Sequence, residues 1–163
     1  MRKNLGKRLE EATSFREVFQ VVKSSVQDVL GTRRAGLELI LMDLPGEVGA
    51  MHQIGSNAII MNRRHLQALL RSSKSRLEVN SYIFYILLHE YLHSLGIPDE
   101  EEVKLLSLRV IKETLGEDHP AYRMASKRGF ELAELLGHER ETGSIENAEL
   151  IKDFDTDNAQ YIA

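Results

Sequence analysis

The chain has 163 residues, of which 42% are hydrophobic and 28% are charged, and its formal net charge at pH 7 is −4. This size and composition fit one globular domain that buries about two thirds of its surface without covalent cross-links. The chain has no cysteine, which excludes disulfides and thiolate metal sites. Its acidic balance gives no electrostatic case for binding nucleic acid.

The two ends of the chain differ in composition. The start has no apolar signal core, and no apolar run approaches the roughly 18 residues that cross a membrane, so we expect a cytoplasmic protein with no membrane partner. Residues 139–163 are acidic and poor in large apolar side chains. This predicts a single domain over 1–138 and a loosely ordered acidic tail over 139–163, whose Leu150, Ile151 and Phe154 could still dock.

The first half of the chain predicts two helices, a strand and a hairpin. A short helix is expected around residues 5–12. Ser14 and Glu17 form a capping box that opens a second helix, which Gly31 ends. Residues 37–44 predict a strand that stops at Pro45-Gly46. Residues 48–54 and 58–61 flank a Gly-Ser-Asn turn and predict a β-hairpin.

The second half predicts four helices. Asn62 can cap a helix over 63–71, and a polar Ser-Ser-Lys-Ser loop then precedes a helix that is apolar almost all round. Asp99 and Glu102 form a capping box for a helix that closes at residue 116. Pro120 suits the first position of a last helix that continues to residue 137. The whole order predicts an α+β fold, with a small mixed or antiparallel sheet flanked by helices.

The apolar helix ends in the stretch His89-Glu90-Tyr91-Leu92-His93. Residues four apart lie on one face of a helix, so both imidazoles can reach one ion. Glu90 can lean over the same cleft and act on a metal-bound water. Buried without partners, these polar groups would each cost about 1–3 kcal/mol, and a divalent metal removes that cost. Gly96 permits the left-handed turn that ends the helix.

This pattern resembles the minimal core of the zincin metallopeptidases, over residues 37–99. The Gly96 and Asp99 extension is similar to the metzincin-type pattern in which Asp replaces the third histidine. The resemblance implies a zincin-like core with a buried HExxH helix, one zinc ion (Zn2+) and a peptide or protein substrate. In zincins a strand shortly before the active helix forms the substrate-binding edge, which the resemblance places at Ala58, Ile59, Ile60 and Met61.

The third metal ligand is left open between several residues. Asp99 has the motif position, but it can also cap the following helix. His119 lies in a loop between the last two predicted helices, where functional residues often lie. Glu102 and Glu113 are further options from the helix after the motif. We predict His89 and His93 as ligands, with Asp99 or His119 as the third.

The remaining histidines have less specific roles. His52, His65 and His138 are expected to be surface or partly buried residues. Tyr122 could donate to an oxyanion, but a contact between two helices is the favoured interpretation.

These residues predict a zinc-dependent hydrolase, and specifically a peptidase, in which Glu90 activates a metal-bound water. One alternative is a metal-dependent endoribonuclease, since the chain also resembles a bacterial rRNA-processing family whose motif has a third histidine and lacks the glutamate. Glu90 and the acidic net charge disfavour it. A second alternative is a zinc-binding interaction domain without turnover.

Overall fold

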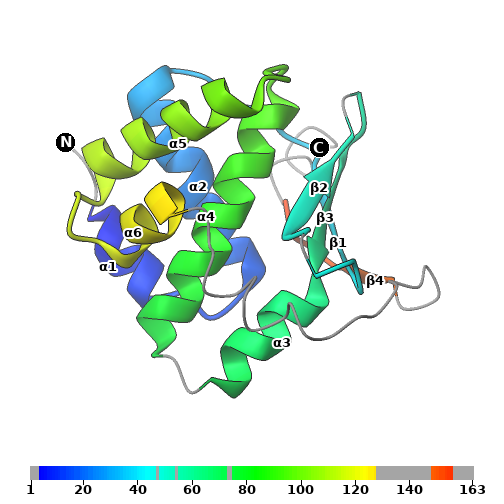
Figure 1. Ribbon diagram of the computed structural model, residues 1–163. Helices are drawn as coiled ribbons and strands as arrows, with labels where there is room; N and C mark the ends of the chain where they lie inside the picture. The colour runs from blue at the N-terminus through cyan, green and yellow to red at the C-terminus, as the bar shows by residue number, and fades with distance from the viewer. Residues whose placement is uncertain (1–3, 47, 54, 73–74, 128–147, 156–163) are drawn as a thin grey trace.

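A computed structural model describes residues 4–46, 48–53, 55–72, 75–127 and 148–155 (Figure 1). Within these residues the chain forms six helices and four strands. In chain order they are α1 (Leu5–Glu11), α2 (Phe15–Leu30), β1 (Glu38–Met42), β2 (Ala50–His52), β3 (Ala58–Asn62), α3 (Arg63–Arg71), α4 (Arg76–Ser94), α5 (Glu100–Thr114), α6 (Pro120–Lys127) and β4 (Glu149–Ile151). This confirms the predicted α+β class. The predicted extension of α6 to residue 137 lies outside the described residues.

The four strands form one mixed sheet in the order β2-β3-β1-β4. β1 is parallel to β3 and antiparallel to β4, while β2 and β3 form the predicted antiparallel hairpin. Alternate residues of the two central strands point into the core. Leu39 and Ile59 are fully buried partners across these strands, and Met61 is buried two residues further on.

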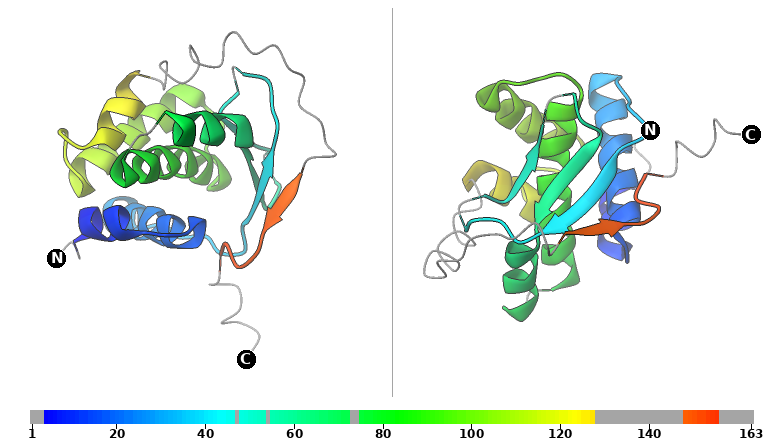
Figure 2. Two further views of the ribbon diagram at one scale, coloured as in Figure 1. Left: turned by 90° about the horizontal axis from the view of Figure 1, so that it is seen from below. Right: turned by 90° about the vertical axis from the view of Figure 1, so that its right-hand side faces the viewer.

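The described helices lie on one face of the sheet (Figure 2). α4 is the central element, packed against α1, α2, α5 and α6 as well as β2 and β3. It is buried on several sides, as its continuous apolar sequence predicted. Phe84, Leu87, Leu88 and Leu92 are fully buried in the core that it shares with the other elements. None of the described helices is long and apolar enough to cross a membrane.

Caps define the helix ends as expected from sequence. Ser14 accepts a hydrogen bond from the Glu17 amide at 3.1 Å, and Gly31 ends α2 at φ 69°. In a standard capping box the Glu17 carboxylate would accept from the amide of the N-cap residue, Ser14. Here it accepts instead from the amide of the preceding residue, Thr13, at 2.9 Å. Asn62 caps α3 by accepting from the Arg64 amide at 3.0 Å.

Residues 148–155 correct the predicted boundary at residue 138, because this part of the expected tail belongs to the fold. β4 pairs with β1, and Phe154 stacks on Phe19 with ring centroids 4.3 Å apart. Asp155 forms a buried ion pair with Lys23 at 2.8 Å. Its second carboxylate oxygen accepts from the Leu37 amide at 3.1 Å, so the charge is both paired and hydrogen-bonded. Of the three apolar residues expected to be able to dock, Phe154 is buried and Ile151 packs against the core, whereas Leu150 is exposed.

Candidate metal centre

The two motif histidines lie near the C-terminal end of α4, on one of its faces. Their ring centroids are 4.9 Å apart, as expected for residues separated by one helical turn. His93 is 7% exposed, whereas His89 is partly buried and lines a cavity. α4 therefore presents two imidazoles together at the edge of the core.

A tight turn brings an acidic side chain back over these histidines. Gly96, at φ 96°, follows the end of α4, and its amide donates to the His93 carbonyl. α5 then begins at Glu100, whose carboxylate oxygens lie 3.0 Å from His89 Nε2 and 2.8 Å from His93 Nε2. Ligand atoms of these three residues all lie within 4.8 Å of one another. The joint between α4 and α5 thus forms a group that could hold a metal ion.

The hydrogen bonding of His93 prepares one ring nitrogen for a cation. Its Nδ1 lies 2.8 Å from the Ile97 carbonyl oxygen, which can only accept, so Nδ1 carries a proton. In the neutral ring, Nε2 then directs a lone pair at the Glu100 carboxylate, which is another acceptor. These two acceptors need a proton or a metal ion between them. Metal-binding histidines commonly have this arrangement, with the second ring nitrogen donating to a carbonyl.

The electrostatics of His89 favour its neutral form. Burial lowers the pKa of His89, and the Glu100 carboxylate opposes this effect only in part. A histidine must be neutral to coordinate a metal, so the lowered pKa suits it for that role near neutral pH.

Glu90 is buried beside this group, with 6% of the residue exposed. Burial raises the pKa of Glu90 to about 7, although the nearby His93 acts to lower it. The negative charge of Glu100 raises it further. A carboxyl group with a pKa near neutrality can both accept and release a proton at physiological pH.

The two predicted third ligands have other roles, and neither belongs to the His/His/Glu group. Asp99 is the N-cap of α5, where its carboxylate accepts from the Glu101 amide at 3.2 Å. His119 Nδ1 accepts from the Ala121 amide at 3.1 Å, at the start of α6. Glu100, the immediate neighbour of Asp99, is the residue that sequence reasoning missed.

The other two acids that we considered as ligands also lie outside the group. Glu102 is exposed on the first turn of α5, and Glu113 forms an ion pair with Arg109 at 2.9 Å. The sequence nevertheless contained a signal that could have indicated Glu100 as a ligand. Once Asp99 is assigned as the cap, Glu100 is the first helical residue, next to the turn that leads back to α4.

The strand that was expected to form the substrate-binding edge, Ala58–Met61, is interior. β3 pairs with β2 on one side and with β1 on the other, so its backbone cannot accept an additional strand. β2 forms this edge of the sheet instead. The hairpin approaches α4 closely, because a Cβ added at Gly49 would lie 3.3 Å from Ile86 Cδ1.

Arg34 joins the C-terminal end of α4 to the turn between β2 and β3. Its guanidinium donates to the Ser94 carbonyl and, at 2.8 Å, to Asn57 Oδ1. The Arg34 amide also donates to the hydroxyl of Tyr91 at 2.8 Å. The hairpin is therefore held in place next to the helix that carries the histidines.

The other candidate residues lie outside the His/His/Glu group. His52 is partly buried on β2, as predicted, while His65 on α3 is 5% exposed and so more deeply buried than expected. Burial lowers the pKa of both. His138 lies outside the described residues. Tyr122 packs against the core on α6, consistent with a contact between helices.

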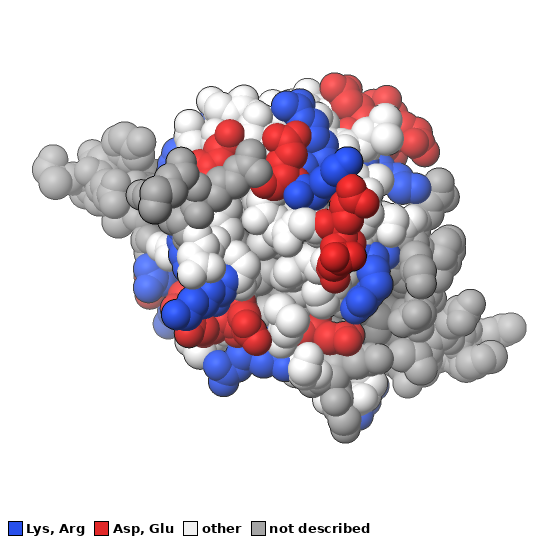
Figure 3. All heavy atoms as spheres, turned by 90° about the vertical axis from the view of Figure 1, so that its left-hand side faces the viewer, with Lys and Arg blue, Asp and Glu red and all other residues white. Residues whose placement is uncertain are grey.

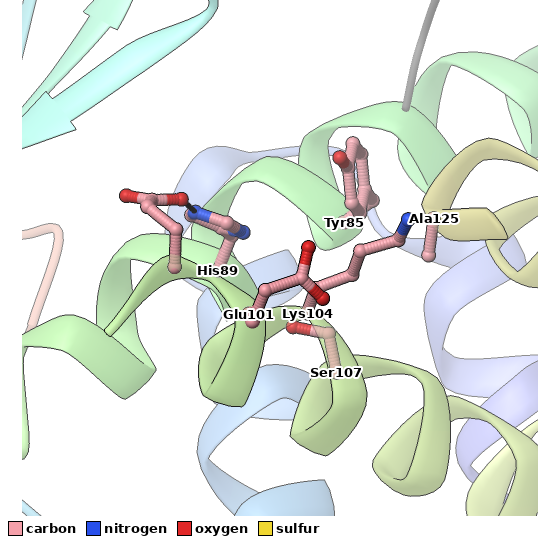
Figure 4. A pocket seen from close by; sticks show the side chains of 7 residues that line it. Tyr85, His89, Glu101, Lys104, Ser107 and Ala125 are labelled. Atoms are coloured by element: carbon pink, nitrogen blue, oxygen red, sulfur yellow. Dashed lines mark hydrogen bonds and ion pairs between the residues drawn. The ribbon is translucent and has the colours of Figure 1, made fainter. Parts of the chain in front are cut away.

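A cavity of about 260 Å³ adjoins the metal group on the side of α5 and α6 (Figure 4). His89 lies at one end of it, and Lys104 and Ala125 lie at the other. Its lining residues are Tyr85, His89, Glu100, Glu101, Lys104, Ser107 and Ala125.

Comparisons with known proteins add no relative. No protein-family model, curated protein or solved structure matches this chain. Function must therefore be argued from the site itself.

Proposed function

We propose that the protein is a zinc-dependent peptidase in which His89, His93 and Glu100 hold one zinc ion and Glu90 transfers protons. The observation that carries this proposal is the meeting of two imidazole nitrogens and a carboxylate within 4.8 Å, beside a buried glutamate. Zinc is the preferred ion because two histidines and one carboxylate are a ligand set of catalytic zinc sites, which leave a fourth position open.

When bound, zinc supplies a Lewis acid that polarises a carbonyl group and lowers the pKa of water. The protein's own groups do the rest. Glu90 follows His89 on α4 and takes a proton from the attacking water, then returns it to the leaving amine. The Ile97 carbonyl holds the His93 ring in one orientation and fixes which nitrogen faces the ion. Arg34 keeps the hairpin, including the edge strand β2, next to α4.

The charge distribution supports a peptide rather than a nucleic acid as substrate. The chain has a net charge of −4, and on the face shown in Figure 3 the acidic and basic side chains of the described residues are interspersed. A nucleic-acid-binding surface normally gathers Lys and Arg along one face or groove.

Glu90→Gln tests the proposed chemistry, because glutamine keeps the size of the side chain and removes the base. We expect zinc content to stay at one ion per chain while turnover of an unstructured peptide library falls at least about 100-fold. Metal content is measured by atomic emission and cleavage by mass spectrometry. Glu102→Gln, an exposed acid on α5, is the matched control and should retain activity.

Two outcomes contradict the proposal. Retained turnover in Glu90→Gln would exclude Glu90 as the base. A wild-type protein that binds zinc fully but cleaves no peptide would favour the zinc-binding interaction domain instead.

A further inference from the structure

The cavity beside the metal group contains a buried hydroxyl that lacks a hydrogen-bond partner. Ser107 is 1% exposed, and among the described residues its Oγ has no partner. Ser107 lines the cavity, and Figure 4 shows its hydroxyl beneath the side chains of Glu101 and Lys104. A buried hydroxyl without a partner is costly, so a ligand in this cavity that bonds to it would remove a penalty of the free protein.

Lys104 adds a positive charge at the end of the cavity away from the metal group. It lies three residues before Ser107 on α5, so both side chains are on the same face of that helix. Lys104 is partly buried, and its ammonium lies next to Ala125 in Figure 4. An ammonium offers three donors and no acceptor, and a hydroxyl can add a fourth donor. The cavity therefore offers these donors to an acceptor with negative charge.

We propose that this cavity is a specificity subsite that binds a carboxylate of the substrate, through the Lys104 ammonium and the Ser107 hydroxyl. The inference rests on the proposed peptidase function and narrows its substrate to peptides with a carboxylate next to the cleaved bond. At about 260 Å³ the cavity is smaller than sites for whole ligands, and its size suits one side chain or a terminal residue. The carboxylate can belong to Asp or Glu, or to the C-terminus of the peptide.

Two acids line the cavity, Glu100 and Glu101. The Glu100 carboxylate faces the two histidines, so the acid that mainly opposes an anion is Glu101. It is exposed, so water screens its charge, whereas Lys104 and Ser107 lie in less exposed positions where charge acts more strongly. We therefore expect Lys104 to decide the preference of the cavity, and removal of the charge in Glu101→Gln to strengthen binding of an anion.

A binding experiment separates this subsite from catalysis. The zinc-loaded Glu90→Gln protein is titrated calorimetrically with three tetrapeptides. The first has a central Glu and blocked ends, the second has Gln in its place and blocked ends, and the third has Gln and a free C-terminus. We expect one or both carboxylate peptides to bind roughly tenfold more tightly than the neutral peptide, as expected for a charge-assisted hydrogen bond. The comparison of the first and third peptides identifies the source of the carboxylate.

Variants on α5 assign the preference to the cavity. Lys104→Met in the same background should abolish it, and Ser107→Ala should reduce it about threefold. Lys112→Met is the matched control, because Lys112 lies on the same helix but is exposed and pairs with Glu117. A preference that persists in Lys104→Met would mean that the metal itself binds the carboxylate, and this would overturn the subsite. Equal binding of all three peptides, or tightest binding of the neutral Gln peptide, would also overturn it.

Turnover by the wild-type protein is measured in parallel. Cleavage without preference for a carboxylate would leave the peptidase function standing and overturn the subsite. Selective binding that depends on Lys104, without any cleavage, would support the subsite and contradict the peptidase function.

Discussion

At the scale of single residues, two neighbouring acids divide the work at the start of α5. Asp99 satisfies a backbone amide of the helix, while Glu100 reaches both motif histidines. A cap must lie just outside the helix, and the residue after it lies on the first turn. One position in the chain therefore separates a structural acid from a candidate ligand.

Substitutions of these two acids should separate their roles. Glu100→Gln is expected to weaken zinc binding at least about tenfold, because even partners outside the ligand set contribute that much. Asp99→Asn should leave both zinc affinity and stability nearly unchanged, since asparagine is an equally good N-cap. Affinity is measured by competition with a chromogenic chelator. Weakened binding in Asp99→Asn but not in Glu100→Gln would show that Asp99 is the ligand and Glu100 is not.

Only the part of the candidate site that depends on local helix geometry could be predicted from sequence. The spacing of His89 and His93 follows from helix periodicity, and the structure brings both residues together with an acid. The choice of that acid depends on the turn at Gly96 and on the hydrogen bond between His93 and Ile97. His119 was a rival ligand because its capping bond to the Ala121 amide was not visible in the sequence.

At the scale of elements, local signals predicted the helices well and the arrangement of strands poorly. Ser14, Gly31 and Asn62 mark helix ends because each cap bonds within a few residues of itself. The position of β3 between β2 and β1, and the pairing of β4 with β1, depend on contacts between distant residues. No short-range pattern carries that information, so the sequence did not reveal that Ala58–Met61 is an interior strand.

His65 on α3 contacts α4 and the loop after β1, and we expect the packing of these segments to be sensitive to pH. Its Nε2 donates to the Gly46 carbonyl at 2.6 Å, and its Nδ1 lies 3.2 Å from the Tyr82 hydroxyl of α4. Burial lowers the pKa of His65 below its ordinary value of 6.5. As pH falls below about 6.5, His65 therefore becomes protonated in the unfolded chain while it stays neutral in the folded chain. The free energy of unfolding decreases as a result.

This effect can be isolated with His65→Gln in metal-free protein. At pH 7.5 the variant should be less stable than the wild type, because it loses the two hydrogen bonds. At pH 5.5 the difference should be smaller, since only the wild type bears the cost of keeping this ring neutral. The change cannot exceed about 1.4 kcal/mol for each pH unit. Urea unfolding at both pH values measures it, and a difference that stays constant would contradict the assignment.

At the scale of the whole molecule, the candidate metal centre lies at the rim of an apolar core that does not include its three residues. The core runs through α4 and its neighbours, where Phe19, Phe84 and Leu92 are at most 1% exposed. The side chain of Glu100, by contrast, is 74% exposed. Burial of apolar surface, and not ligation, should therefore stabilise the fold.

Removal of zinc should leave the protein folded. After chelation we expect the helical circular dichroism signal to persist and thermal unfolding to remain cooperative. Zinc at 100 times its dissociation constant should add about 2.7 kcal/mol, which corresponds to roughly 5–10 °C in Tm for a chain of this size. His89→Gln is the control and should lose most of this increase. Collapse of the helical signal on chelation would instead indicate a structural zinc site, because folding would then depend on the metal.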